Sequence, residues 1–216
     1  MKRIVAIGAV GLVLGAWSGV AGAEVTGIGV GVKAGMLGLG AEITKSVTET
    51  VNVRVGLNSY KFTTSGTESG TNYDIDLKWQ SSAVLFDWHP SGGSFRLTAG
   101  YLFNSNKLAM SVKPGSTYDI NGYTGTLGAS EYLTGEVKFD SGPYVGLGWG
   151  NAADGKGFGM SLEIGAAYQG SPKATLATNI AGVTGTDIAR EQANVEDSLS
   201  NYKWYPQVAL GVSYAF

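Results

Sequence analysis

The last thirteen residues, 204–216, read WYPQVALGVSYAF. Large apolar or aromatic side chains occupy every second position from Trp204 to Phe216, and smaller or more polar residues such as Gln207 and Ser213 fill most of the others. Strict alternation of this kind predicts a β-strand. The run is longer than the usual strand of a soluble protein, and it is long enough to cross a bilayer when tilted.

The same alternation recurs upstream in residues 28–33, 37–44, 51–58, 73–85, 95–104, 136–149 and 158–169. Alternation alone also describes a soluble barrel or sandwich, in which the bulky apolar face points inward. Here the opposite face is small, glycine-rich and charged, so it fits inside a narrow cylinder, while the apolar face suits lipid. The sequence therefore predicts an all-β, antiparallel, up-and-down transmembrane β-barrel in the bacterial outer membrane.

Aromatic residues gather at the expected strand ends, as in the two interfacial girdles of a membrane barrel. One group is Phe95, Trp149, Phe158, Tyr214 and Phe216, and the other is Tyr73, Phe103, Phe139, Tyr168 and Trp204.

The connections alternate in length. Residues 45–49, 89–93 and 151–156 are short and polar, which is typical of periplasmic turns, whereas residues 64–72, 114–133 and 171–201 are expected to be extracellular loops. An even strand number requires two strands within residues 25–46, turning near Gly35, which makes about eight strands; one long strand there is the alternative. Residues 187–200 fit either a short helix or a mobile polar loop.

The N-terminus has the pattern of a cleaved secretory signal peptide. Lys2 and Arg3 precede an apolar run over residues 4–14, and Ala21-Gly22-Ala23 forms a small-residue cleavage site before Glu24. The run is too short and too rich in glycine for a membrane-spanning helix. We expect a signal peptide at residues 1–23 and one barrel domain at residues 24–216.

Composition excludes several classes of function. The chain has no cysteine, so disulfides, thiolate metal sites and lipid anchoring through cysteine are excluded. Without Lys2 and Arg3, 13 of the 15 basic residues remain against 17 acidic ones, and no basic cluster suggests nucleic-acid binding. The single histidine, His89, lies in an expected turn without a nucleophile or acid beside it, and no catalytic or nucleotide-binding motif is present. The sequence indicates neither an enzyme nor a metal or cofactor site.

Charged residues on the small faces form an expected lumen set. Its basic members are Lys33, Arg54, Lys78, Arg96 and Lys138, and its acidic members are Glu42, Asp74, Asp76, Glu136, Asp140 and Glu163. Side chains can just fill the interior of eight strands, so one interpretation is a salt-bridged plug. The other is a narrow gated path for a small zwitterion or cation.

Three segments resemble the C-terminal part of the CarO family of small outer-membrane proteins: PYVGLG at 143–148, EIGAAYQGSPK at 163–173 and YKWYP at 202–206. The resemblance extends over roughly residues 136–216. The ending Ser213-Tyr214-Ala215-Phe216 is also similar to the signal that barrel-insertion machinery reads. The resemblance implies an eight-stranded barrel associated with uptake of small, especially basic, amino acids and with carbapenem susceptibility.

Two hypotheses follow. The first is a narrow channel for amino-acid-sized solutes, either zwitterionic or basic. The second is a closed structural or binding barrel whose extracellular loops contact lipopolysaccharide, a surface or a partner protein. In both, outer-membrane lipid and lipopolysaccharide surround the protein.

Overall fold

A computed structural model describes residues 27–68 and 71–216, so the expected signal peptide lies outside the described residues. Eight strands form a closed antiparallel ring. They are β1 (Ile28–Gly35), β2 (Gly38–Ser46), β3 (Val51–Glu68), β4 (Thr71–Trp88), β5 (Phe95–Asn104), β10 (Gly142–Trp149), β11 (Gly157–Tyr168) and β13 (Trp204–Ala215). Pairing of β1 with β13 and of β4 with β5 closes the ring. The prediction of an eight-stranded barrel is confirmed.

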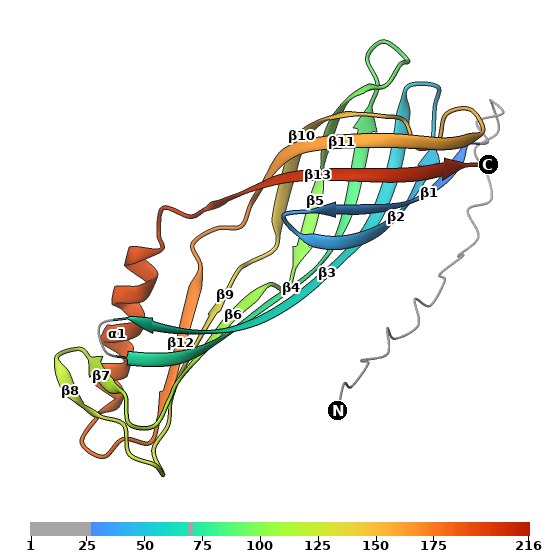
Figure 1. Ribbon diagram of the computed structural model, residues 1–216. Helices are drawn as coiled ribbons and strands as arrows, with labels where there is room; N and C mark the ends of the chain where they lie inside the picture. The colour runs from blue at the N-terminus through green and yellow to red at the C-terminus, as the bar shows by residue number, and fades with distance from the viewer. Residues whose placement is uncertain (1–26, 69–70) are drawn as a thin grey trace, which may run out of the picture.

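Residues 28–46 form the two-strand hairpin that strand parity requires. β1 and β2 pair from Ile28 with Lys45 to Gly35 with Gly38, so the turn lies at the expected place. The connections 47–50, 89–94 and 150–156 lie together at one end of the barrel, beside the C-terminus (Figure 1). We call this the short-loop end; in outer-membrane barrels it is the periplasmic one.

The longer connections build a second unit at the opposite end. β3 and β4 remain paired as far as Glu68 and Thr71, so most of the predicted 64–72 loop is strand. Three strands continue the sheet from β4 in the order β6 (Lys107–Val112), β9 (Leu133–Lys138) and β12 (Lys173–Thr178). We call residues 60–68 and 71–79 together with β6, β9 and β12 the extension; Figure 1 shows it projecting away from the barrel.

The predicted continuous strand 136–149 is wrong in one respect. It divides into β9 and β10 at residues 139–141, because β9 pairs with β6 and β12 of the extension while β10 pairs with β5 and β11 of the barrel. Alternating side chains cannot reveal a change of partner strand, because both strands have the same period.

The outer part of the extension carries a hairpin and a helix. β7 (Thr117–Ile120) pairs with β8 (Tyr123–Thr126), and α1 (Gly185–Ser198) lies beside β12. The hydroxyl of Thr184 accepts from the backbone N–H of Asp187, whose carboxylate accepts from the backbone N–H of Thr184 in return, a capping box that starts the helix. The helix interpretation is confirmed, although the helix spans residues 185–198 rather than 187–200. None of the described helices has the length and apolar character of a membrane-spanning helix.

Apolar side chains cover the outside of the barrel, as predicted. Phe158 and Met160 are 85% and 78% exposed, and the outward residues of β1, β2, β5, β10 and β13 are exposed as well. Aromatic rings contact one another near both ends: Phe95 with Trp149 and Phe158 with Tyr214 at the short-loop end, and Tyr168 with Trp204 at the other. Tyr73 is a correction, because it belongs to the extension rather than to a girdle.

The polarity of the two faces inverts along β3 and β4. Around Arg54 and Asp87 the inward side of the barrel is polar and the outward side apolar, whereas in the extension the concave side is apolar and the convex side charged. On β4, for example, Asp87 and Leu77 lie on the same side of the strand, ten residues apart, but one enters the barrel and the other the concave face of the extension. This inversion places several predicted lumen residues outside the barrel.

Candidate functional site

The barrel interior contains a compact layer of ion pairs centred on Arg54 of β3. Its guanidinium donates to the Asp87 carboxylate from Nε at 2.9 Å and from Nη2 at 3.1 Å. Nη1 lies 3.2 Å from Glu42 Oε2, and Nη2 also donates to Glu163 Oε2. One guanidinium therefore links three carboxylates from three other strands.

Two more cations complete the layer. Arg96 Nη2 donates to Glu163 Oε2 at 3.0 Å, its Nε lies 3.5 Å from Asp87 Oδ1, and Lys33 Nζ lies 3.1 Å from Glu42 Oε2. We call these six residues the ionic layer: Lys33, Glu42, Arg54, Asp87, Arg96 and Glu163. Three cationic and three anionic groups balance, and their side chains are only 3–7% exposed. Buried charges are tolerated when they are paired in this way.

Glycine makes room for these long side chains. A Cβ on Gly148 would lie 2.7 Å from Arg96 Cζ, and a Cβ on Gly165 would lie 2.2 Å from the Tyr144 hydroxyl oxygen. The small face that alternates along the strands is thus the space that the ionic layer fills.

A polar layer lies between the ionic layer and the short-loop end. His89, which is 1% exposed, places Nδ1 2.8 Å from the Gly93 carbonyl oxygen. Because that carbonyl can only accept, Nδ1 carries the proton, and Nε2 accepts from the Asn52 amide at 3.2 Å. The same amide group donates to Asn151 at 2.8 Å, joining the connection after β10 to the inside of the barrel.

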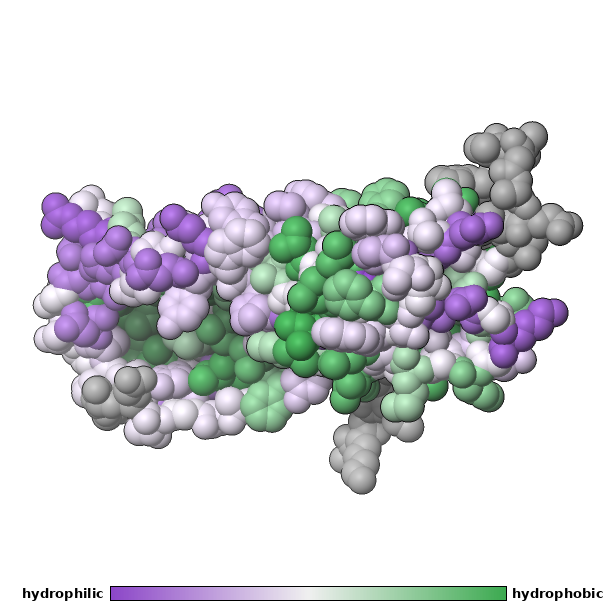
Figure 2. Space-filling model, turned by 90° about the horizontal axis from the view of Figure 1, so that it is seen from above, coloured by the Kyte–Doolittle hydropathy of each residue, from purple (hydrophilic) through white to green (hydrophobic). Residues whose placement is uncertain are grey.

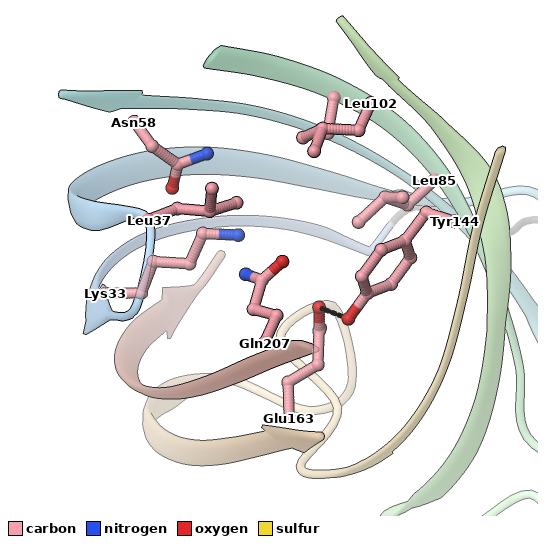
Figure 3. A pocket seen from close by; sticks show the side chains of 9 residues that line it. Lys33, Leu37, Asn58, Leu85, Leu102, Tyr144, Glu163 and Gln207 are labelled. Atoms are coloured by element: carbon pink, nitrogen blue, oxygen red, sulfur yellow. Dashed lines mark hydrogen bonds between the residues drawn. The ribbon is translucent and has the colours of Figure 1, made fainter. Parts of the chain in front are cut away.

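An apolar layer closes the opposite side. It consists of Leu37, Ala83, Leu85, Leu102, Tyr144 and Ala167, with Trp79 and Tyr205 packed against them. Trp79 Nε1 donates to the Tyr205 hydroxyl at 3.1 Å, which donates to the Met36 carbonyl at 2.8 Å. Figure 3 shows Tyr144 reaching from this layer to Glu163, to which its hydroxyl donates at 2.7 Å.

The space left inside is small. One cavity of about 10 Å³ is lined by members of the ionic and apolar layers, among them Lys33, Leu85 and Gln207, and another of about 10 Å³ lies among Arg54, Asp87 and His89. Each has room for about one water molecule. Because the side chains of the ionic layer are only 3–7% exposed and those of the apolar layer are buried beside them, the described interior is a plug of packed side chains.

Five predicted lumen residues meet in this plug: Lys33, Glu42, Arg54, Arg96 and Glu163. The other six lie outside the barrel interior: Asp74, Asp76, Lys78, Glu136, Lys138 and Asp140. They belong to the convex side of the extension or to its junction with β10.

Four of the six outer residues make surface ion pairs. Lys113 Nζ lies 2.9 Å from Asp74, Lys107 Nζ lies 3.1 Å from Glu136, and Lys173 Nζ lies 3.2 Å from Asp140. A hydrogen bond from Lys138, with a second from Lys107, lowers the pKa of Glu136. The placement of all six as lumen residues is corrected: five lie on the charged, convex side of strands that continue beyond the barrel, and Asp140 lies in the connection between β9 and β10.

Sequence reasoning missed Asp87, which receives two hydrogen bonds from Arg54 and one from Thr98 at 2.6 Å. The signal was present: Asp87 stands between Phe86 and Trp88, an aromatic pair on the opposite face of the strand. Because Phe86 and Trp88 face outward, Asp87 faces the interior of the barrel. The alternation along β4 then determines which side of the strand every other residue occupies.

Comparison with known proteins finds solved structures of similar fold. No protein-family model and no curated protein matches the chain. The crystal structure of Acinetobacter baumannii CarO2 matches with a TM-score of 0.59 and 25% identity, over 90% of this chain and 100% of that one. The structure of A. baumannii CarO matches with a TM-score of 0.58 and 22% identity, over the same shares of both chains. The chain is CarO-like.

This CarO-like chain is thus a small β-barrel of the bacterial outer membrane. Among the residues that the structure describes, no group of three or more histidine, aspartate or glutamate side chains is arranged to hold a metal ion.

Proposed function

We propose that this CarO-like protein is a closed barrel that anchors the extension at the outer surface, where the extension contacts lipopolysaccharide, a surface or a partner protein. The observation that carries the proposal is the filled interior. The ionic layer and the apolar layer lie one above the other across the barrel, and the cavities beside them each have room for about one water.

Opening a path for a solute through this interior is costly. Arg54 would have to leave three carboxylates that are almost fully buried, and an uncompensated buried charge is strongly destabilising. Leu37, Leu85 and Leu102 would also have to move apart, exposing apolar surface to water.

Planar-bilayer recording tests the closed state directly. We expect the refolded protein to give no discrete openings. A matched variant in which a short turn replaces residues 171–201 should remain heat-modifiable on gels and lose binding to lipopolysaccharide-coated beads. Discrete openings of the unmodified protein, or unchanged bead binding of the truncated variant, would contradict the proposal.

A second candidate is a gated channel for zwitterionic or basic amino-acid-sized solutes, as the resemblance to CarO implies. The charge balance of the ionic layer favours it, because adjacent cationic and anionic groups complement a solute that carries both an ammonium and a carboxylate. The ion pairs would then act as the gate.

Neutralising the gate tests the channel. Glu163→Gln should increase the entry of glycine and ornithine in a liposome-swelling assay, and Asp74→Asn is the matched control because Asp74 lies on the outside of the extension. Swelling that equals protein-free liposomes for both variants and the parent excludes this candidate.

We further propose that residues 1–23 are a signal peptide, that residues 24–216 form the mature barrel domain, and that insertion machinery recognises the C-terminal strand. Tyr214 and Phe216 support the last point, because both lie outward on the lipid side, 37% and 62% exposed, where a recognising protein can reach them. Phe216→Ala should slow assembly of the heat-modifiable form, while Ser213→Ala, on the inward side, should not.

A further inference from the structure

The concave face of the extension has an apolar stretch that the described residues, 27–68 and 71–216, leave partly exposed. Its members lie on neighbouring strands in register: Phe62 opposite Leu77, Leu77 opposite Leu108, and Leu108 opposite Val137. With Tyr60, Ile75 and Met110 on the same face, these residues form what we call the trough: Tyr60, Phe62, Ile75, Leu77, Leu108, Met110 and Val137.

Two hydrophobic clusters close the ends of the trough. At the barrel end lie Trp79 and Tyr205 with the apolar layer. At the outer end Val112 and Leu176 pack against a second cluster, made by Tyr118, Ile120, Leu127, Leu133 and Ile180. From Trp79 to the pairing of Tyr73 with Val112 is six residues of β4, or about 20 Å of strand.

The trough is open to solvent between these clusters. Tyr60, Phe62 and Met110 are 47%, 44% and 41% exposed although they lie on a concave face. Figure 2 shows a hollow with a hydrophobic floor in the part of the molecule occupied by the extension and α1. Exposed apolar surfaces that are hollowed and rimmed by polar residues mark binding sites.

We propose that the trough binds one linear hydrocarbon chain of a free amphiphile, whose polar head stays in the surrounding water. None of the seven trough side chains is charged, so the lining complements an uncharged chain and offers little to a sugar or an ionic solute. Its length of about 20 Å exceeds the roughly 15 Å of hydrocarbon in one bilayer leaflet, so one lipid-sized chain fits within it.

The source of the chain is a free amphiphile rather than the surrounding bilayer. The convex side of the same strands bears Lys61, Asp76 and Lys107, so this part of the sheet stands in water above the hydrocarbon. A bilayer lipid would have to leave the membrane to enter the trough. The inference rests on the proposed function, because it names a ligand for the extension that the closed barrel carries.

Tryptophan quenching by a brominated chain tests the proposal. Trp88, Trp149 and Trp204 are changed to phenylalanine so that Trp79, at the inner end of the trough, reports alone from the mature protein in lipid nanodiscs. Dibrominated stearic acid should quench Trp79 along a saturating curve. In a reference protein that retains only Trp149, which faces lipid, quenching should rise linearly as the probe enters the bilayer.

Charge placed in the trough should abolish the saturating curve. Met110→Lys should weaken binding by about tenfold or more, because an ammonium is costly beside a hydrocarbon chain. Ala109→Lys is the matched control: Ala109 lies on the opposite face beside Asp76 and Glu136, so a lysine there is accommodated and binding should stay unchanged. Heat-modifiability on gels confirms that each variant is folded.

Three results would overturn the inference. Linear quenching of Trp79 would show that the fatty acid only partitions into the bilayer. Equal effects of Met110→Lys and Ala109→Lys would place the hydrocarbon chain elsewhere, and strong quenching of Trp79 by brominated nanodisc lipids without added fatty acid would make bilayer lipid the occupant. None of these three results bears on the planar-bilayer recording, so that recording tests the closed-barrel proposal independently of this inference.

Discussion

Replacing Arg54 with methionine removes the cation that links Glu42, Asp87 and Glu163, while keeping an unbranched side chain of roughly similar volume. Removing one partner from a buried ion pair costs about 3–5 kcal/mol. Each carboxylate keeps another donor, for example Lys33 at 3.1 Å for Glu42, so we expect the lower end, about 3 kcal/mol. The layer would then carry two cations against three anions.

A second change tests whether charge balance is the cause. Arg54→Met combined with Glu163→Gln restores neutrality and leaves the new side-chain amide able to contact Arg96, so the double variant should recover about 1–2 kcal/mol relative to the single one. Equilibrium urea unfolding in lipid vesicles measures both, with Asp74→Asn, which lies outside the barrel, expected within about 0.5 kcal/mol of the parent. A loss below about 1 kcal/mol for Arg54→Met, or strictly additive losses in the double variant, would refute the reasoning.

Three further outcomes are expected. Gly165→Ala should cost about 1–3 kcal/mol in the same assay because the new Cβ collides with Tyr144, whereas Gly159→Ala on the same strand, where the nearest atom is 3.3 Å away, should cost less. A hydrogen bond from the hydroxyl of the helix N-cap, Thr184, lowers the pKa of Asp187, so the contribution of this carboxylate to stability is complete above the ordinary aspartate pKa and is lost as pH falls through the lowered folded value. NMR chemical shifts of α1 should therefore change only in that acidic range, and a change near neutrality would contradict this. Mass spectrometry of the protein extracted from outer membranes should find Glu24 at its N-terminus, and an uncleaved chain would exclude the signal peptide.

The barrel is predictable from the strand pattern, because lipid outside selects apolar side chains and a narrow interior selects small or polar ones at alternate residues. The thirteen-residue C-terminal run corresponds to β13 almost without change, and the parity of strand number located the turn between β1 and β2. Arg54 and Glu163 were found in the same way, since a charge on the small face of a spanning strand has to lie inside.

The extension was not predictable by the same rule. Alternation separates two faces but does not say which faces water. At the level of Leu77 on β4 the surroundings reverse, so the pattern predicts the wrong side for Asp76 and Lys78. The partners of β9 depend on contacts between distant segments, which the local pattern does not record. Of the trough residues, Ile75, Leu77 and Val137 fall on the apolar face of the expected strands, which the pattern assigns to lipid, and the other four lie outside those strands.

The reversal of polarity along β3 and β4 also fixes the depth of the protein in the bilayer. On the outer side of β3 the apolar series ends at Leu57 and is followed by Ser59 and Lys61, and the residues paired with Leu57 and Ser59 on β4 are Ser82 and Gln80. Sinking deeper would draw first Ser59 and then Lys61 into hydrocarbon, and rising would lift valine and leucine into water. The side chains of β3 and β4, the two longest strands, therefore set the height at which the extension stands above the membrane surface.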